Sequence, residues 1–191
     1  MKIVLAGPPR SGKSCLREGL KKALMRIPDA PYPYVITACP DGEGSWFQET
    51  VNTNPELAKE LKAAYKAKFT PAFVTRISDS VSKCSLPLVL VDIGGIVTDE
   101  NRAICKDATH MLILAGDPAK KAEWYAFAEE LGLVVFADID SAYHDKEDVI
   151  LPMENGIFRG SVHYLERGEN TAERPVIQAL AKALAEAGND L

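Results

Sequence analysis

Residues 7–14 read GPPRSGKS, and their spacing, G-x-x-x-x-G-K-[ST], constrains the fold more than any other part of the sequence. An apolar segment at 2–6 precedes this loop, and a helical pattern at 12–27 follows it with leucines along one stripe. The glycines let the backbone approach an anion, and a helix N-terminus offers N–H groups to it. The pattern therefore predicts a strand, a phosphate-binding loop and a helix in succession. The alternative interpretation is a plain glycine turn that opens a helix.

The residues of this loop have distinct expected roles. Lys13 is expected to reach the β- and γ-phosphates of a nucleotide and to assist catalysis, and the Ser14 hydroxyl is expected to bind Mg²⁺. Pro8 and Pro9 have no backbone N–H, so the amides of residues 10–14 must form the phosphate cradle. The predicted nucleotide-binding residues of the loop are Gly7, Arg10, Ser11, Gly12, Lys13, Ser14 and Cys15.

A second motif ends the apolar stretch LPLVLVDIGG at 86–95. Asp92 is a carboxylate at the carboxyl end of an expected buried strand, where it would hold the hydration shell of Mg²⁺ near Ser14. The alternative role for Asp92 is to cap the following turn. The spacing from Asp92 to Gly95 resembles the γ-phosphate sensor of G-proteins and related P-loop switches. That resemblance implies a Gly95 amide against the γ-phosphate, which would tie residues 96–101 to the nucleotide state.

Apolar segments and helical patterns alternate along the chain. Five segments without strict alternation are typical of strands covered on both faces; they lie at 2–6, 34–39, 86–93, 110–116 and 133–139. Helical patterns lie at 12–27 and 55–68, and Thr70-Pro71, Asp117-Pro118 and Arg174-Pro175 are expected helix starts. The expected fold class is α/β, a three-layer sandwich around a mostly parallel five-stranded sheet.

The segment at about 149–165 departs from this alternation of strands and helices. Its Asn155-Gly156 pair is a strong signal for a two-residue turn, so a β-hairpin appendage is expected there. A last helix is expected from Pro175 to Ala187. No interdomain linker can be recognised, so residues 1–191 are expected to form a single nucleotide-binding domain.

The glycine-rich segment ACPDGEGSWF, at 38–47, follows the second expected strand. Ligands of α/β sheets gather at the carboxyl ends of the strands, which is where this segment would emerge. Asp41 is the first candidate for a general base or a water-orienting group, and Glu43 is the second. The alternative is that Asp41 only forms a local turn with its own backbone.

Composition excludes several classes of protein. The formal net charge of −5 argues against general nucleic-acid binding. The four cysteines are widely spaced without a C-x-x-C pair, which favours free thiols over a zinc site or a disulfide framework. The N-terminus lacks the features of a signal peptide and no segment is long enough to span a membrane, so a cytoplasmic location is expected.

The motifs GPPRSGKS and LVLVDIGG, a Walker A and a Walker B pattern, resemble the P-loop nucleoside-triphosphatase superfamily. The resemblance implies a nucleotide ligand with Mg²⁺, and ATP is preferred because no Asn-Lys-x-Asp motif supports guanine binding. The arginine-rich lid of nucleoside-monophosphate kinases is missing, since 117–131 contains no arginine. PDGEGSWF, DIGG and the segment 166–181 also resemble the P-loop domain fused to some CRISPR-associated ring nucleases. That second resemblance implies an accessory role in cyclic-oligoadenylate signalling.

Two functions follow from these motifs. The first is a small-molecule kinase that transfers the γ-phosphate of ATP to a hydroxyl acceptor, with Asp41 as the base. The second is a regulatory switch ATPase whose nucleotide state acts on a protein partner. The compact size and the single catalytic-looking acid favour the kinase, which we rank narrowly first. The Asp-x-Gly-Gly motif and the missing lid favour the switch. The acceptor, the protein partner and the oligomeric state stay open at this point.

Overall fold

The computed structural model describes residues 1–39 and 69–189 of the chain. Its strands are β1 (Lys2–Ala6), β2 (Pro33–Thr37), β3 (Leu88–Asp92), β4 (His110–Leu114), β5 (Val134–Ala142), β6 (Val149–Glu154) and β7 (Ile157–His163). Its helices are α1 (Lys13–Leu24), α4 (Pro71–Lys83), α5 (Asp99–Cys105), α6 (Pro118–Glu130) and α7 (Pro175–Asn189), with a 3₁₀ turn, η1 (Thr171–Glu173), before α7. Asp41, Glu43 and the helix expected at 55–68 lie outside the described residues.

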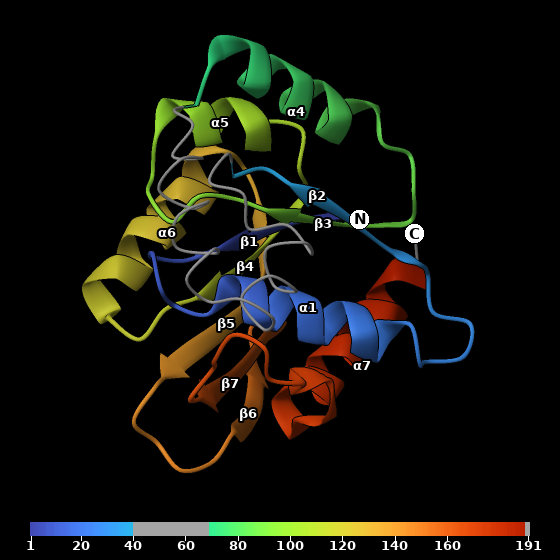
Figure 1. The fold of residues 1–191 in the computed structure, drawn as a ribbon, viewed down its shortest axis with the longest axis vertical. Coiled ribbons are helices and arrows are strands. Elements are labelled where there is room, and N and C mark those ends of the chain that lie inside the picture. The colour runs from blue at the N-terminus through green and yellow to red at the C-terminus, as the bar shows by residue number, and fades with distance from the viewer. Residues whose placement is uncertain (40–68, 190–191) are drawn as a thin grey trace.

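The strands form one sheet in the order β2-β3-β1-β4-β5-β7-β6 (Figure 1). All neighbouring pairs are parallel except β6 and β7, which are antiparallel. The five predicted strands and the predicted hairpin are confirmed, but the expected five-stranded sheet is wrong in its count. Among the described residues the sheet has seven strands, because β7 pairs in parallel with β5 and the hairpin therefore extends the sheet.

The turn of this hairpin agrees with the sequence signal. Asn155 and Gly156 both adopt positive φ, at 52° and 77°, as a two-residue turn of this type requires. The parallel pairing of β7 with β5 has a different origin, because the chain must first run out along β6 at the sheet edge and then return. That pairing depends on a tertiary contact, which the turn signal does not specify.

Helices cover both faces of the sheet, as Figure 1 shows. Ile3 and Leu5 of β1 belong to a cluster with α1 and α7 residues, whereas Val4 and Ala6 belong to a cluster with residues of α4, α5 and α6. Successive side chains of a strand point to opposite faces, so a strand that is covered twice must be apolar at every position. This explains the unbroken apolar segments of the central strands.

The predicted helix starts at Pro71 and Pro118 are confirmed. The Thr70 side chain accepts a hydrogen bond from the Phe73 amide at 3.2 Å, and Asp117 Oδ1 accepts one from Ala119 at 2.8 Å. Each cap satisfies an amide that has no partner within its helix. Within residues 1–39 and 69–189, no helix combines the length and the apolar character that a membrane crossing requires.

Candidate functional site

The loop between β1 and α1 has a backbone that only certain residues tolerate. Gly7 and Gly12 adopt φ of 144° and 93°, and Arg10 adopts 65°, a left-handed conformation that is uncommon for a side-chain-bearing residue. A Cβ at Gly7 would lie 2.0 Å from the Leu114 carbonyl oxygen of β4, and a Cβ at Gly12 would lie 2.7 Å from Leu165. Both glycines of the motif are therefore required by close neighbours as well as by φ.

Lys13 lies inside the curve of this loop. Its side chain is buried with the rest of the residue, and Nζ donates to the carbonyl oxygens of Gly7 at 2.8 Å and Pro8 at 3.0 Å. The Pro8 carbonyl also accepts from the Ser11 amide at 3.3 Å. The loop thus holds the ammonium group by its own main chain, at the point where α1 begins.

The N-terminus of α1 faces the same loop. Gly12 is the N-cap residue and provides no side-chain cap, and the first turn contains no acidic residue. Aligned peptide dipoles give a helix N-terminus a partial positive charge, which favours an anion. The positive end of α1 and the Lys13 ammonium group therefore reinforce each other in a small buried volume.

Two neighbouring segments hold the outer side of the loop. Ser141, near the end of β5, donates its hydroxyl hydrogen to the Ser11 carbonyl at 2.8 Å, and Leu165, just after β7, packs against Gly12. Neither residue was among the predicted site residues. Their only signal in the sequence was a position at the carboxyl end of a parallel strand, because such ends meet at one edge of the sheet.

Asp92 lies at this edge too. It ends β3, and its register partner on the neighbouring strand β1 is Leu5, two residues before the phosphate loop. Its Oδ2 accepts a hydrogen bond from Arg17 Nη1 of α1 at 2.9 Å, and both side chains are almost fully buried, at 6% and 4% exposure. Arg17 was not among the predicted site residues. Its signal was a charged residue one turn after Lys13, on a side of α1 that continues with the apolar Leu20 and Leu24.

The segment after Asp92 touches the phosphate loop through its backbone. A Cβ at Gly95 would lie only 2.5 Å from the Pro9 nitrogen and 2.9 Å from the Pro8 carbonyl carbon. The Asn101 side-chain amide donates to the carbonyl oxygens of Gly94 at 3.2 Å and Ile96 at 2.8 Å. Asn101 is buried in α5, so this helix holds the glycine segment against the loop.

The pKa values of two groups near the site, the Cys15 thiol and the Tyr143 hydroxyl, are raised. Burial raises the pKa of the Cys15 thiol, in the first turn of α1, which keeps it neutral and unreactive. The hydrogen bond from Tyr143 to Glu166, at 2.9 Å, is the main cause that raises the pKa of Tyr143 to about 12. Neither group therefore supplies a base to the site near neutral pH.

The oxygen donors of the site suit a hard divalent cation. Ser14 and Asp92 are both buried, and hydroxyl and carboxylate oxygens, with water, are the ligands that Mg²⁺ prefers. The Arg17 guanidinium lies against the Asp92 carboxylate, so this carboxylate is ion-paired in the structure. The residues present therefore fit the predicted Mg²⁺.

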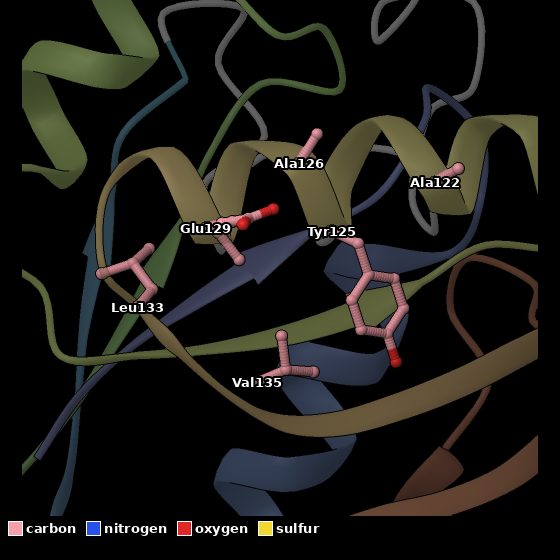
Figure 2. A pocket seen from close by; sticks show the side chains of 7 residues that line it. Ala122, Tyr125, Ala126, Glu129, Leu133 and Val135 are labelled. Atoms are coloured by element: carbon pink, nitrogen blue, oxygen red, sulfur yellow. The ribbon is translucent and has the colours of Figure 1, made fainter.

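A separate groove of about 570 Å³ lies between α6 and the start of β5 (Figure 2). Its lining is mostly apolar and includes no residue of the phosphate loop; the residues labelled in Figure 2 are Ala122, Tyr125, Ala126, Glu129, Leu133 and Val135. The Tyr125 hydroxyl donates to Asp138 at 2.9 Å, on the face of the sheet that α6 covers. The groove contributes nothing to the site at the ends of the strands.

The comparison with solved structures found a protein of the same fold. It is described as a plasmid partition protein from Borrelia burgdorferi B31, and its crystal structure contains bound AMPPNP. The two chains are 12% identical, the match covers 99% of this chain and 98% of that chain, and the TM-score is 0.59. No protein-family model and no curated protein matches the sequence. The likeness shows that the two chains share an α/β fold.

Proposed function

We propose that this protein binds ATP with Mg²⁺ in the loop at 7–14 and acts as a nucleotide-dependent switch ATPase. The observation that carries the proposal is the contact between Gly95 and the Pro8-Pro9 segment of the loop, together with the two Asn101 hydrogen bonds that fix the glycine segment to α5. The AMPPNP bound to the plasmid partition protein of the same fold supports the choice of nucleotide.

Several groups of the phosphate loop and of α1 would hold the phosphates. The α1 N-terminus and the amides of residues 10–14 offer donors to the phosphate oxygens, and Lys13 exchanges the Gly7 and Pro8 carbonyls for the β- and γ-phosphates. Arg10 lies in the same loop with an exposed side chain, which is available to a γ-phosphate oxygen. Ser14 and Asp92 would hold Mg²⁺, which supplies positive charge that neutralises the phosphate oxygens.

The switch would act through the glycine segment. A γ-phosphate that bonds the Gly95 amide would change how the segment 94–96 lies against Pro8 and Pro9. Asn101 passes such a movement to α5, because its amide bonds the carbonyls on both sides of Gly95. Ile96, next to Gly95, is 64% exposed, so a protein partner that binds there could respond to the movement directly.

A phosphotransferase remains the second candidate, and one observation favours it. Thr37 of β2 is the register partner of Asp92, and the Ala38 amide donates to the Asp92 carbonyl at 2.8 Å. The chain therefore leaves β2 at the phosphate edge, four residues before Asp41. Asp41 or Glu43 would act as the base of such a reaction. The accessory role in cyclic-oligoadenylate signalling stays a prediction from the sequence.

The binding experiment is calorimetric titration with AMPPNP and Mg²⁺. Lys13→Ala should weaken binding at least about 100-fold, because it removes a charge-assisted contact with the phosphates. Lys22→Ala is the matched control: it removes a lysine from the exposed side of the same helix, where Lys22 pairs with Glu18 at 3.6 Å. Equal affinity of Lys13→Ala and wild type would refute the proposed nucleotide site.

The two functions separate by the fate of the γ-phosphate. A switch transfers it to water at a rate that a partner changes, whereas a kinase transfers labelled phosphate to a hydroxyl acceptor. In either case Asp41→Asn should lower turnover by about 10² to 10⁴ with little change in affinity, because a base acts only in the chemical step. Glu43→Gln, assayed in parallel, tells which acid is used. Wild-type turnover in both variants and in the double variant would exclude a catalytic role for this segment.

A further inference from the structure

Arg17 and Lys13 place two cations on one side of α1. They are four residues apart, which is one turn of the helix, and both are buried, at 3% and 9% exposure. Like charges at this spacing repel each other, and burial makes a charge costly unless an opposite charge compensates it. Lys13 donates to main-chain carbonyls, and Asp92 provides a carboxylate against Arg17.

The same carboxylate is the one that Mg²⁺ would use. Asp92 Oδ2 lies 2.9 Å from Arg17 Nη1, within a nearly dry environment where charges interact more strongly than in water. A guanidinium group at this distance lowers the negative potential that attracts a hydrated cation to Asp92. Arg17 and Mg²⁺ would therefore compete for one acid.

We propose that Arg17 is a positioning residue that sets the magnesium requirement of the nucleotide site by holding Asp92. This inference rests on the proposed nucleotide binding. In the nucleotide-free protein the Arg17–Asp92 pair stabilises the junction of α1 and β3 and supplies positive charge next to Lys13. Phosphates bound at the loop are then partly neutralised by the chain itself, and full occupancy by Mg²⁺ requires the pair to weaken.

A purely structural role for the Arg17–Asp92 ion pair would give a different result in a magnesium titration. If Arg17 only stabilised the fold, its replacement would lower the melting temperature and would leave the magnesium dependence of nucleotide binding unchanged. If Arg17 competes with Mg²⁺, its replacement must also lower the Mg²⁺ concentration at which binding is half-maximally enhanced. The magnesium titration separates the two roles, because the stability of the free protein does not affect the Mg²⁺ concentration at the midpoint.

The test is AMPPNP binding by calorimetry over a series of free Mg²⁺ concentrations, from a chelated sample upward. Arg17→Gln should shift the midpoint of the magnesium effect about 10-fold lower, as the loss of one competing charge predicts. Arg17→Lys retains the charge and should stay close to wild type. Lys22→Gln, which removes a positive charge from an exposed position of the same helix, should not move the midpoint.

Different results would overturn the role of Arg17 and the proposed function. An unchanged or higher midpoint in Arg17→Gln, or an equal shift in Arg17→Lys, overturns the inference and leaves nucleotide binding intact. If no protein in the series binds AMPPNP, wild type included, the proposed function fails and the inference fails with it.

A second measurement covers an Arg17→Gln protein that does not fold. In wild-type protein with AMPPNP bound, the guanidinium NMR signals of Arg17, assigned by their loss in Arg17→Lys, should shift when Mg²⁺ is added. Signals that do not respond would overturn the competition.

Discussion

At the scale of single residues, the site depends on how closely the backbone of one segment approaches that of another. Gly94 and Gly95 are neighbours, yet the space around them differs. A Cβ at Gly94 would lie 3.4 Å from the Phe69 ring, an ordinary contact, whereas a Cβ at Gly95 would lie 2.5 Å from the Pro9 nitrogen. Neither glycine has a positive φ, so the difference between them is purely one of space.

This difference gives a matched pair of variants. Gly95→Ala must displace either the phosphate loop or the glycine segment, and overpacking of this kind costs about 1–3 kcal/mol. We expect Gly95→Ala to weaken AMPPNP binding by about 5-fold to 150-fold, and Gly94→Ala to weaken it by less than about 3-fold. Calorimetric titration of both proteins measures the effect. Equal affinities for the two variants would mean that the contact with Pro9 has no part in nucleotide binding.

At the scale of elements, three charged or polar side chains connect the hairpin to the last helix. Asp148, just before β6, accepts hydrogen bonds from Arg174, just before α7, and from both the amide, at 3.1 Å, and the ring, at 2.7 Å, of His163 at the end of β7. Burial alone would raise the pKa of Asp148, but the hydrogen bonds from Arg174 and His163 outweigh it and lower this pKa. The ionised carboxylate therefore stabilises the junction.

The lowered pKa fixes the sign of a pH dependence. A carboxyl group whose pKa is lower in the folded protein stabilises the fold above its unfolded pKa of about 3.9 and loses that contribution as the pH falls through the folded value. We expect Asp148→Asn to lower the free energy of unfolding by about 3 kcal/mol at pH 7, because it removes one partner of a buried ion pair. The difference from wild type should shrink below about pH 4.

Urea denaturation over a pH series checks this expectation. Asp79→Asn is the control, since Asp79 forms an exposed ion pair with Lys83 on α4 and should change stability little. A difference between Asp148→Asn and wild type that stays constant down to pH 3 would show that the charge of Asp148 is not what stabilises the junction.

At the scale of the whole molecule, the sheet brings the parts of the proposed switch together at one end of its strands, and the hairpin edge lies apart from them. The loop at 7–14, the glycine segment and α5 lie around the carboxyl ends of β1 and β3, whereas β6 is the strand at one edge of the sheet. All six residues of β6 are exposed. A nucleotide at the loop should therefore act on the first group and not on β6.

Hydrogen exchange with and without AMPPNP and Mg²⁺ tests this division. We expect slower exchange at residues 10–16 and 94–105 with the nucleotide bound, and no change at 149–154. Binding at 100 times Kd also stabilises the folded state by about 2.7 kcal/mol, so the comparison belongs under conditions where exchange occurs by local opening. Uniform slowing along the chain, with no excess at 94–105, would contradict a switch that acts through the glycine segment.

The sequence alone determined the features whose cause is local. The spacing of GPPRSGKS, the apolar segments of the central strands, the caps at Thr70 and Asp117 and the Asn155-Gly156 turn each depend on residues a few positions apart, so a pattern can reveal them. The place of the hairpin in the strand order does not have a local cause. A hairpin signal fixes the turn between β6 and β7, but not that β7 pairs with β5.

Only the tertiary structure decided which residues of the site meet. Arg17 and Asp92 are 75 positions apart, Ser11 and Ser141 are 130 apart, and Gly95 reaches Pro9 through a contact between backbones. Each contact requires the parallel register of β1, β3, β4 and β5 to bring separate strand ends to one edge of the sheet. Because the partner of a buried charge is chosen by that register and not by its sequence neighbours, the sequence could assign Asp92 to a cation but could not show that Arg17 already holds it.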